Sequence, residues 1–251
     1  MNDTQSKTSI SFDNGKHFQV IKVEPNSSIY YENACVAEFE LDCQQDLTTK
    51  YFHKPWVVKF HGIYHCRYSH RRHLFVSFNG GLTWKIFQQF SEDFIFLNHG
   101  SLILARQYMS ESLWYSYDEG NHWYNDSYAD VFKIKKIASI NTLVASVVLY
   151  NKIDYIYTIL NYDFSSIISI CYITIDRTCQ RDDYEIWYVP RYNDNCFDGE
   201  EVSYFKIKPS SMCLDKRTVI IPNISTCKYV DQDYRNNRHL PLGIAEEQER
   251  A

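Results

Sequence analysis

Short apolar runs separated by polar turns make up the chain as far as about residue 160. Runs such as Leu74-Phe75-Val76 and Leu113-Trp114-Tyr115 are rich in aromatic and β-branched residues, which favour extended strands. The three-to-four-residue apolar repeat of an amphipathic helix is hard to find; only the polar stretch 243–251 could form a short helix. The pattern therefore predicts an all-β chain.

The longest apolar stretch, residues 137–160, is interrupted by Asn141, Asn151, Lys152 and Asp154. A membrane-spanning helix needs about 20 largely apolar residues, so this stretch predicts strands instead. The first residues of the chain lack the apolar core of a signal peptide. We therefore expect neither a signal peptide nor a transmembrane segment in this sequence.

One turn motif occurs three times, with the pattern Ser-x-Asp/Asn-x-Gly-x-x-aromatic. In such a turn the Asp or Asn side chain accepts backbone hydrogen bonds, and the Gly adopts a positive φ. The aromatic side chain is expected to pack on the sheet beneath. The motif residues are Ser11, Asp13, Gly15 and Phe18; Ser77, Asn79, Gly81 and Trp84; and Ser116, Asp118, Gly120 and Trp123.

Strand-like runs flank each turn, so the repeating unit is strand, turn, strand. The step from Ser77 to Ser116, between the second and third turns, is close to the length of one four-stranded propeller blade. The step from Ser11 to Ser77 is much longer, and the excess contains Cys35 and Cys43. We expect a loop insertion there.

After residue 160 the composition changes: polar and aromatic residues separate regularly spaced cysteines. Cys179, Cys196, Cys213 and Cys227 follow one another at short and nearly even intervals. This spacing predicts a small module stapled by disulfides. The expected domains are a partial propeller over residues 1–168, a cysteine-rich module over 169–236 and a disordered tail over 237–251.

Charge and sequons narrow the class of protein. The net charge is −5 and the basic residues are dispersed, which argues against nucleic-acid binding. Eight cysteines allow either disulfides or reduced thiols. Glycosylation sequons at Asn26, Asn125 and Asn223 favour disulfides and a secretory origin.

Candidate catalytic and metal-binding residues are sparse. The adjacent acids Asp182-Asp183 and Glu200-Glu201 are expected to be solvated, and the acids of the repeated motif are expected to form its turns. The sequence also lacks a phosphate-binding glycine loop and a compact zinc motif. We therefore predict no catalytic residue, no metal and no cofactor, despite one cluster with zinc-binding chemistry: His53, His61, His65, Cys66, His70 and His73.

The repeated turns resemble the Asp boxes of β-propellers, which occur in sialidases, some glycosidases and the sortilin family. The segments after the third turn resemble the sortilin family, in which the last propeller strand leads into a cysteine-rich module. They are Asp163-Phe164-Ser165, Cys179-x-x-x-Asp183-Tyr184-x-x-Trp187, Cys196-x-x-Gly199 and Ser210-Ser211-x-Cys213.

The resemblance implies about three Asp-box blades of a ten-bladed propeller, followed by a small disulfide-rich module. It also implies three disulfides, Cys179–Cys213, Cys196–Cys227 and Cys35–Cys43. Cys66 and Cys171 have no family counterpart and could pair or be free. The sequence departs from the family at Tyr229 and Asn236, where cysteines are expected, and it lacks the second cysteine-rich module.

The function implied is that of a non-enzymatic fragment of a sorting-receptor ectodomain. Such a receptor binds peptides, propeptides and secreted proteins on the luminal or extracellular side of the Golgi, endosome or plasma membrane. The leader and membrane anchor would then lie outside this sequence, and an isolated arc of blades would aggregate or stay partly unfolded. The alternatives are a fragment of a sialidase-like Asp-box hydrolase and a nonfunctional truncated product. The resemblance assigns no ligand contact to a residue of this sequence.

Overall fold

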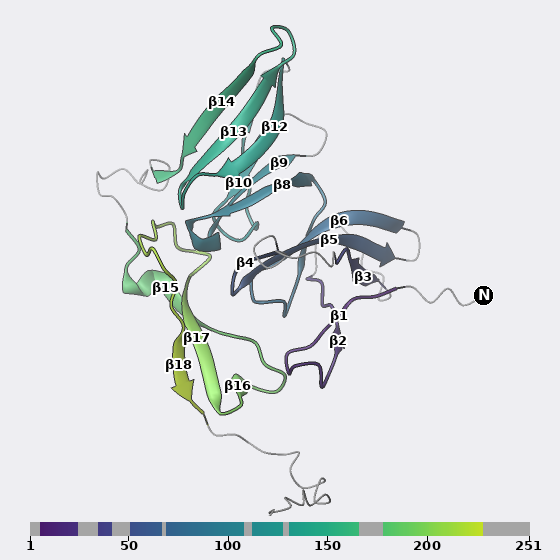
Figure 1. Cartoon of the computed structure of the whole chain (residues 1–251), viewed down its shortest axis with the longest axis vertical. Helices are drawn as coiled ribbons and strands as arrows, with labels where there is room; N and C mark the ends of the chain where they lie inside the picture. The colour runs from purple at the N-terminus through teal and green to yellow at the C-terminus, as the bar shows by residue number, and fades with distance from the viewer. Residues whose placement is uncertain are drawn as a thin grey trace, which may run out of the picture.

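A computed structural model describes residues 6–24, 35–41, 51–66, 69–107, 112–127, 131–165 and 178–227. Its strands form four successive antiparallel sheets, followed by the sheet of the cysteine-rich module (Figure 1). The structure confirms the predicted all-β partial propeller with a disulfide-rich module. The expected tail over 237–251 lies outside the described residues.

The two-stranded first sheet pairs β1 (Ser9–Ile10) with β2 (Gln19–Val20). The second sheet has the order β3-β5-β6-β7, with β4 paired to β5. The third has the order β8-β9-β10-β11 and the fourth β12-β13-β14. Their bounds are β3 (Val36–Phe39), β4 (Phe52–Lys54), β5 (Val57–Cys66), β6 (Ser69–Ser77), β7 (Lys85–Phe87), β8 (Phe90–Leu97), β9 (Leu102–Gln107), β10 (Ser112–Ser116), β11 (Tyr124–Ser127), β12 (Phe132–Ser139), β13 (Val144–Asn151) and β14 (Tyr157–Asp163).

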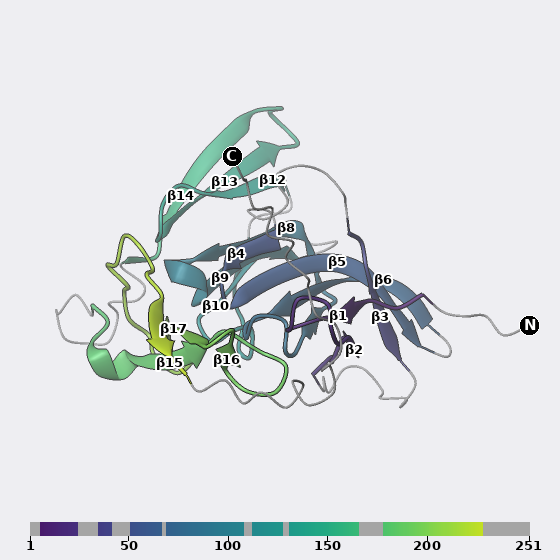
Figure 2. The same cartoon turned by 60° about the horizontal axis from the view of Figure 1, so that its bottom comes forward.

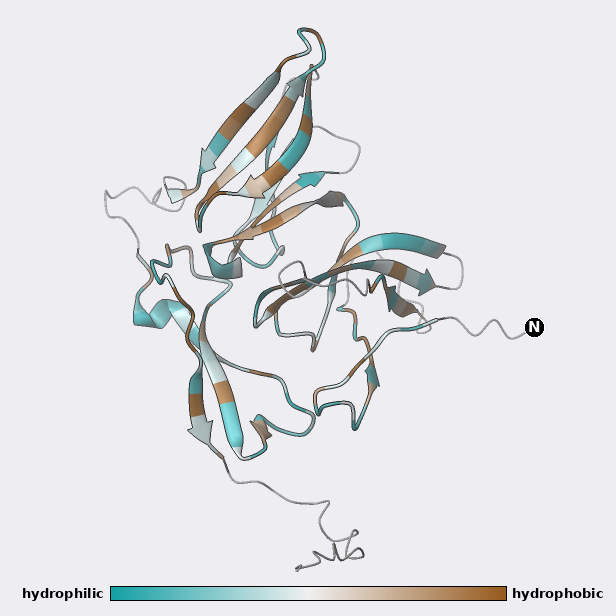
Figure 3. Ribbon diagram, in the orientation of Figure 1, coloured by the Kyte–Doolittle hydropathy of each residue, from teal (hydrophilic) through white to brown (hydrophobic). Residues whose placement is uncertain are grey.

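Three apolar cores lie between successive sheets. Ile21 and Trp84 belong to the first core, Leu74 and Phe94 to the second, and Ile134 and Val147 to the third. Hydrophobic and hydrophilic bands alternate along the strands of the fourth sheet, as strands with one buried face require (Figure 3). Face-to-face burial of consecutive sheets is the packing of propeller blades.

The cysteine-rich module has a sheet of its own, in the order β15-β17-β16, with β18 paired to β17. It lies beside the second and third sheets and near β1 and β2 (Figure 2). Its elements are a short 3-10 turn η2 (Arg181–Asp183), β15 (Tyr184–Tyr188), β16 (Cys196–Phe197), β17 (Glu200–Ile207) and β18 (Asn223–Thr226).

Two disulfides of the module, Cys179–Cys213 and Cys196–Cys227, have the pairing implied by the family resemblance. The expected Cys35–Cys43 bridge is wrong, because Cys35 is bonded to Cys66. The register of β3 on β5 is the physical reason. Val36 lies opposite His65 in the antiparallel pair, so Cys35, just before Val36, faces Cys66, just after His65, at a Cα–Cα distance of 4.4 Å. Cys43 and Cys171 lie outside the described residues.

Candidate functional site

The three Asp-box turns share one hydrogen-bonded geometry. In each, the Ser Oγ accepts the N–H of the Gly four residues later at 2.8–2.9 Å. The Asp or Asn Oδ1 accepts the N–H four residues later, also at 2.8–2.9 Å. Two consecutive positive φ values turn the chain, as at Glu119 (59°) and Gly120 (79°). The Asx and Gly positions are therefore explained by turn formation.

Hydrogen bonding within these turns keeps the box acids ionised. Burial opposes the charge on Asp13, but hydrogen bonds from His17 and Ser11 lower the pKa of Asp13 to about 2. The pKa of Asp118 is lowered in the same way, against burial, by His122 and Ser116. An ionised acceptor that serves the backbone is not available as a general acid.

The aromatic position separates the first box from the other two. Trp84 is 1% exposed, and its indole donates to the Gly81 carbonyl at 2.9 Å. Trp123 donates in the same way to Gly120. Phe18 is 67% exposed, so the expectation that it packs on the sheet beneath is wrong. The described part of the first sheet has two strands and offers little surface to cover it.

All three boxes contact the cysteine-rich module, and the central contact is Lys206 on β17. Its ammonium group donates to the carbonyl of Phe78 in the second box at 2.9 Å. It also lies 2.6 Å from the carboxylate of Glu119 in the third box and 3.6 Å from that of Glu185. One buried lysine therefore joins the turns of two successive blades.

The ion pair at this junction is shielded from solvent. The side chains of Lys206 and Glu119 are 8% and 15% exposed. Burial raises the pKa of Glu119, and the neighbouring Lys206 opposes that rise. The Lys85 ammonium also donates to the Glu119 carbonyl at 3.0 Å. A charged group in such a place needs its partner to remain ionised.

Aromatic residues and a close backbone approach extend the contact to the second box. A Cβ atom on Gly80 would lie 2.8 Å from the ring of Trp187. Trp56 on the blade side has its ring 5.9 Å from that of Trp187 and 6.0 Å from that of Tyr204. In the first box, His17 stacks on Tyr192 at 4.3 Å. The module thus runs along all three turns.

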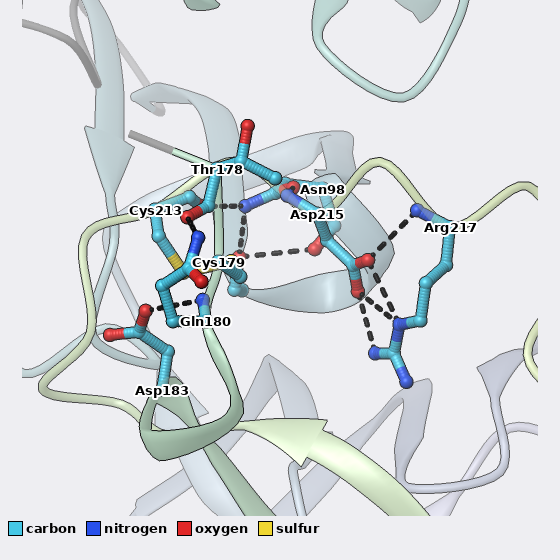
Figure 4. Close-up of a disulfide and its surroundings, with 9 residues drawn as sticks. Asn98, Thr178, Cys179, Gln180, Asp183, Cys213, Asp215 and Arg217 are labelled. Carbon is cyan, nitrogen blue, oxygen red and sulfur yellow. Dashed lines mark hydrogen bonds and ion pairs between the residues drawn. A yellow bond between two sulfur atoms is a disulfide. The ribbon is translucent and has the colours of Figure 1, made fainter. Parts of the chain in front are cut away.

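A second anchor lies at the 3-10 turn η1 (Asn98–Gly100), between β8 and β9 (Figure 4). The Asn98 amide donates to the Cys213 carbonyl and accepts the Asp215 N–H, both at 2.9 Å. His99 Nε2 donates to the Arg217 carbonyl at 2.7 Å. All three residues of the turn have positive φ. The side chains of Asn98 and His99 therefore point at the segment 213–217, which we call the strap.

An internal ion pair stiffens this strap. Asp215 is 1% exposed, and its carboxylate accepts three hydrogen bonds from the Arg217 guanidinium at 2.6–3.0 Å. Burial opposes ionisation, but Arg217 lowers the pKa of Asp215. The guanidinium lies 4.4 Å from the centre of the Tyr184 ring. Burial, with Asp215 nearby, raises the pKa of Tyr184 to about 12.

A cavity of about 10 Å³ lies between the two anchors. His99, Tyr117, Glu119 and Lys206 line it, and His99 Nδ1 and the Tyr117 hydroxyl are buried without a protein partner. Its volume suits a single water molecule. This cavity therefore has no room for a peptide side chain.

The acidic pairs and the histidine cluster noted in the sequence do not come together in one site. Asp183 Oδ2 accepts the Gln180 N–H at 2.8 Å and so caps η2, which accounts for one acid of the Asp182-Asp183 pair. Of the histidine cluster, the structure brings together His65 and His70, while Cys66 is no longer a thiolate. Across the described ranges, no three His, Cys, Asp or Glu side chains are grouped to hold a metal ion.

Lys206, Asn98 and Asp215 were not among the residues singled out in the sequence. A lone lysine on a strand resembles a solvated residue. The run Asn98-His99-Gly100 did carry a turn signal, since Asn and Gly tolerate positive φ. Sequons Asn125 and Asn223 are exposed, whereas Asn26 lies outside the described residues.

Two family models match the chain. The first, described as "Sortilin, neurotensin receptor 3", matches residues 1–137, and its C-terminal counterpart matches residues 142–239. The second match begins inside the fourth sheet, between β12 and β13. Together the two models span both the blades and the module.

Curated relatives carry related names. The mouse VPS10 domain-containing receptor SorCS1 is 26% identical over 66% of this chain, and the human receptor SorCS3 is 27% identical over 66%. Vacuolar protein sorting/targeting protein 10 of Aspergillus flavus is 26% identical over 64%. The chain spans 12–14% of the length of these relatives. Because the first family model alone covers more than half of the chain, the chain belongs to the sortilin (Vps10) family.

Proposed function

We propose that this chain is a segment of a sorting-receptor ectodomain in which the cysteine-rich module braces the Asp-box face of a propeller arc. The observation that carries the proposal is Lys206, which ties the turns of two successive blades to one strand of the module. In this proposal residues 1–168 form the arc, 169–236 the module and 237–251 a tail. The arc contributes to a surface that binds peptides, propeptides and secreted proteins for traffic between Golgi and endosome.

A binding role rather than catalysis agrees with how the ionised groups are used. Asp13 and Asp118 serve their own turns, and Asp215 is paired with Arg217. Two of the relatives are named receptors, and the third is named for protein sorting and targeting. No observation favours the sialidase-like alternative. Turnover of a fluorogenic sialoside by the purified chain would contradict the non-enzymatic role.

A luminal or extracellular location is supported by covalent chemistry. The three disulfides are typical of proteins folded in an oxidising compartment. Asn125 and Asn223 are exposed sequons. In secretory cells, N125Q and N223Q should each remove one glycan-dependent step in gel mobility. The control N121Q, at an exposed Asn outside any sequon, should remove none; unchanged mobility of all variants would contradict the location.

The brace itself is tested by hydrogen exchange on the chain secreted behind a supplied leader. K206M should accelerate amide exchange in the second and third boxes, because it removes their common partner. K208M, at a neighbouring lysine that contacts the Asp182 carbonyl instead, is the matched control and should leave both turns protected. Equal protection of both boxes in K206M and wild type would contradict the brace.

Ligand binding is tested separately by calorimetry with a panel of secreted propeptides and neurotensin, the peptide in the family description. Saturable one-to-one binding of at least one member is expected. Absence of binding by every member at about 1 mM would contradict the ligand-binding part of the proposal. The exchange experiment would still decide whether the module braces the boxes.

A further inference from the structure

The strands β3, β5 and β6 of the second sheet lie side by side (Figure 1). Where the β5–β6 hairpin ends, two histidines that the brace does not use face each other. His65 on β5 is directly opposite His70 on β6. Their Nδ1 atoms are 3.1 Å apart. The other ring nitrogen of His65, Nε2, lies 2.7 Å from the carboxylate of Glu38 on β3. Three neighbouring strands therefore each supply one side chain to the same place.

Glu38 determines which nitrogen of His65 carries the proton. The Glu38 carboxylate oxygen lies 2.7 Å from His65 Nε2, and a carboxylate can only accept hydrogen bonds. The His65 Nε2 must therefore donate, which leaves a lone pair on Nδ1. A carboxylate that holds one ring nitrogen while the other presents its lone pair is the arrangement found behind metal-binding histidines.

The distance between the two Nδ1 atoms suits a shared metal ion. Imidazole nitrogens bind zinc at about 2.0–2.1 Å, and with bonds of that length a 3.1 Å separation corresponds to an N–metal–N angle of about 100°. This angle lies between the cis angle of square-planar coordination and the tetrahedral angle. With the lone pair on His65 Nδ1, the 3.1 Å contact requires the Nδ1 of His70 to donate; in the metal-bound form this proton would be on the Nε2 of His70 instead.

We propose that His65 Nδ1 and His70 Nδ1 bind one divalent transition-metal ion, with Glu38 holding His65 in the binding tautomer. Cys66 cannot contribute a thiolate because it is bonded to Cys35. Two imidazoles are thus the protein ligands, and water completes the coordination. Imidazole ligands suit Zn²⁺, Ni²⁺ and Cu²⁺, and Cu²⁺ binds most tightly in this series.

The ion would join β5 and β6 beside the Cys35–Cys66 bridge. His70 is exposed and the His65 side chain is 15% exposed, so an ion can enter from solvent without unfolding the sheet. Because the ion binds the folded state, it should raise the thermal unfolding midpoint of the wild-type chain. This inference does not depend on the proposed brace, since none of its residues takes part in the module contacts described above.

The test is calorimetric titration of the secreted, disulfide-bonded chain with Cu²⁺ and with Zn²⁺. Wild type should bind one Cu²⁺ more than H65Q or H70Q, and Cu²⁺ should bind more tightly than Zn²⁺. E38Q should keep this ion but bind it about 10–100-fold more weakly, the usual effect of losing a supporting partner. H122Q, at an exposed histidine on a distant turn, should retain it.

Electron paramagnetic resonance of the added Cu²⁺ supplies a readout that folding defects would not imitate. Two coordinated imidazole nitrogens are expected in wild type and H122Q. H70Q is the decisive variant, because an exposed residue can be replaced without disturbing the fold. Equal Cu²⁺ stoichiometry and affinity in H70Q and wild type, or a spectrum with one nitrogen, would overturn the proposal.

Discussion

The blades and the cysteine-rich module are stabilised by different means. The blades bury three apolar clusters between their sheets and have one disulfide among the described residues. The module has two disulfides, and it adds half-buried Trp187, Tyr204 and Ile220 to the cluster between the second and third sheets. Its own buried residues include the charged Lys206 and Asp215. A segment with few apolar residues can therefore be ordered by cross-links and by docking on a larger core.

The largest change in the free energy of unfolding is expected when the buried aromatic residue of an Asp box is replaced. W84A should lower the free energy of unfolding by about 3–5 kcal/mol, because the indole is 1% exposed within a packed core. F18A is the matched control: it should change that free energy by less than about 0.5 kcal/mol, because Phe18 is largely exposed. Chemical denaturation measures both, and similar losses would contradict the contrast between the boxes.

Removal of a disulfide should destabilise the cysteine-rich module more than the blades. The Cys179–Cys213 disulfide closes a loop with a sequence separation of 34 residues. Replacing both cysteines by Ser should therefore destabilise the module by about 4 kcal/mol, because the unfolded chain gains conformational entropy. The Cys35/Cys66 pair spans 31 residues, so its chain-entropy effect is similar, but the apolar cores remain around it. Limited proteolysis should therefore cut within 178–227 only in the first variant. Equal resistance of the module in both variants would argue against this dependence.

The buried ion pair should behave as a coupled unit. K206M alone leaves the Glu119 carboxylate buried without its ammonium partner and should cost about 3 kcal/mol in stability. E119Q alone leaves the buried Lys206 ammonium without the Glu119 carboxylate and should also lower stability. The double variant K206M/E119Q should recover much of the loss, because neither charge remains buried. Additive losses in a double-mutant cycle would show that the two groups are not coupled.

Low pH should reduce the free energy of unfolding through protonation of His53 on β4. Burial, and then the charges of Lys59 and Lys54, lower the pKa of His53 to about 4, below its ordinary 6.5. The unfolded chain therefore takes up the proton first, so stability is complete above about pH 6.5 and is lost as the pH falls towards 4. The loss is about 1 kcal/mol at pH 5.5 and about 3 kcal/mol at pH 4. H53Q should flatten the pH dependence of unfolding in this window; an unchanged slope would exclude His53 as its source.

The strands and the Asp-box turns were predictable because both depend on local chemistry. Alternating apolar residues favour strands, and Ser, Asx and Gly at fixed offsets make a turn with two positive φ values. The module pairs Cys179–Cys213 and Cys196–Cys227 were implied by the family resemblance, since spacing alone leaves several pairings open. These features need no knowledge of which strands become neighbours.

The partner of Cys35, the exposure of Phe18 and the role of Lys206 were decided only by tertiary structure. Cys35 meets Cys66 because β3 pairs with β5 in one register, and Phe18 is exposed because its sheet has little surface there. Lys206 is buried because Phe78 and Glu119, both distant from it in sequence, converge on its ammonium group. The sequence by itself determined which turns and strands form; the packing of distant strands determined which of their side chains meet, because burial and charge pairing depend on neighbours in space.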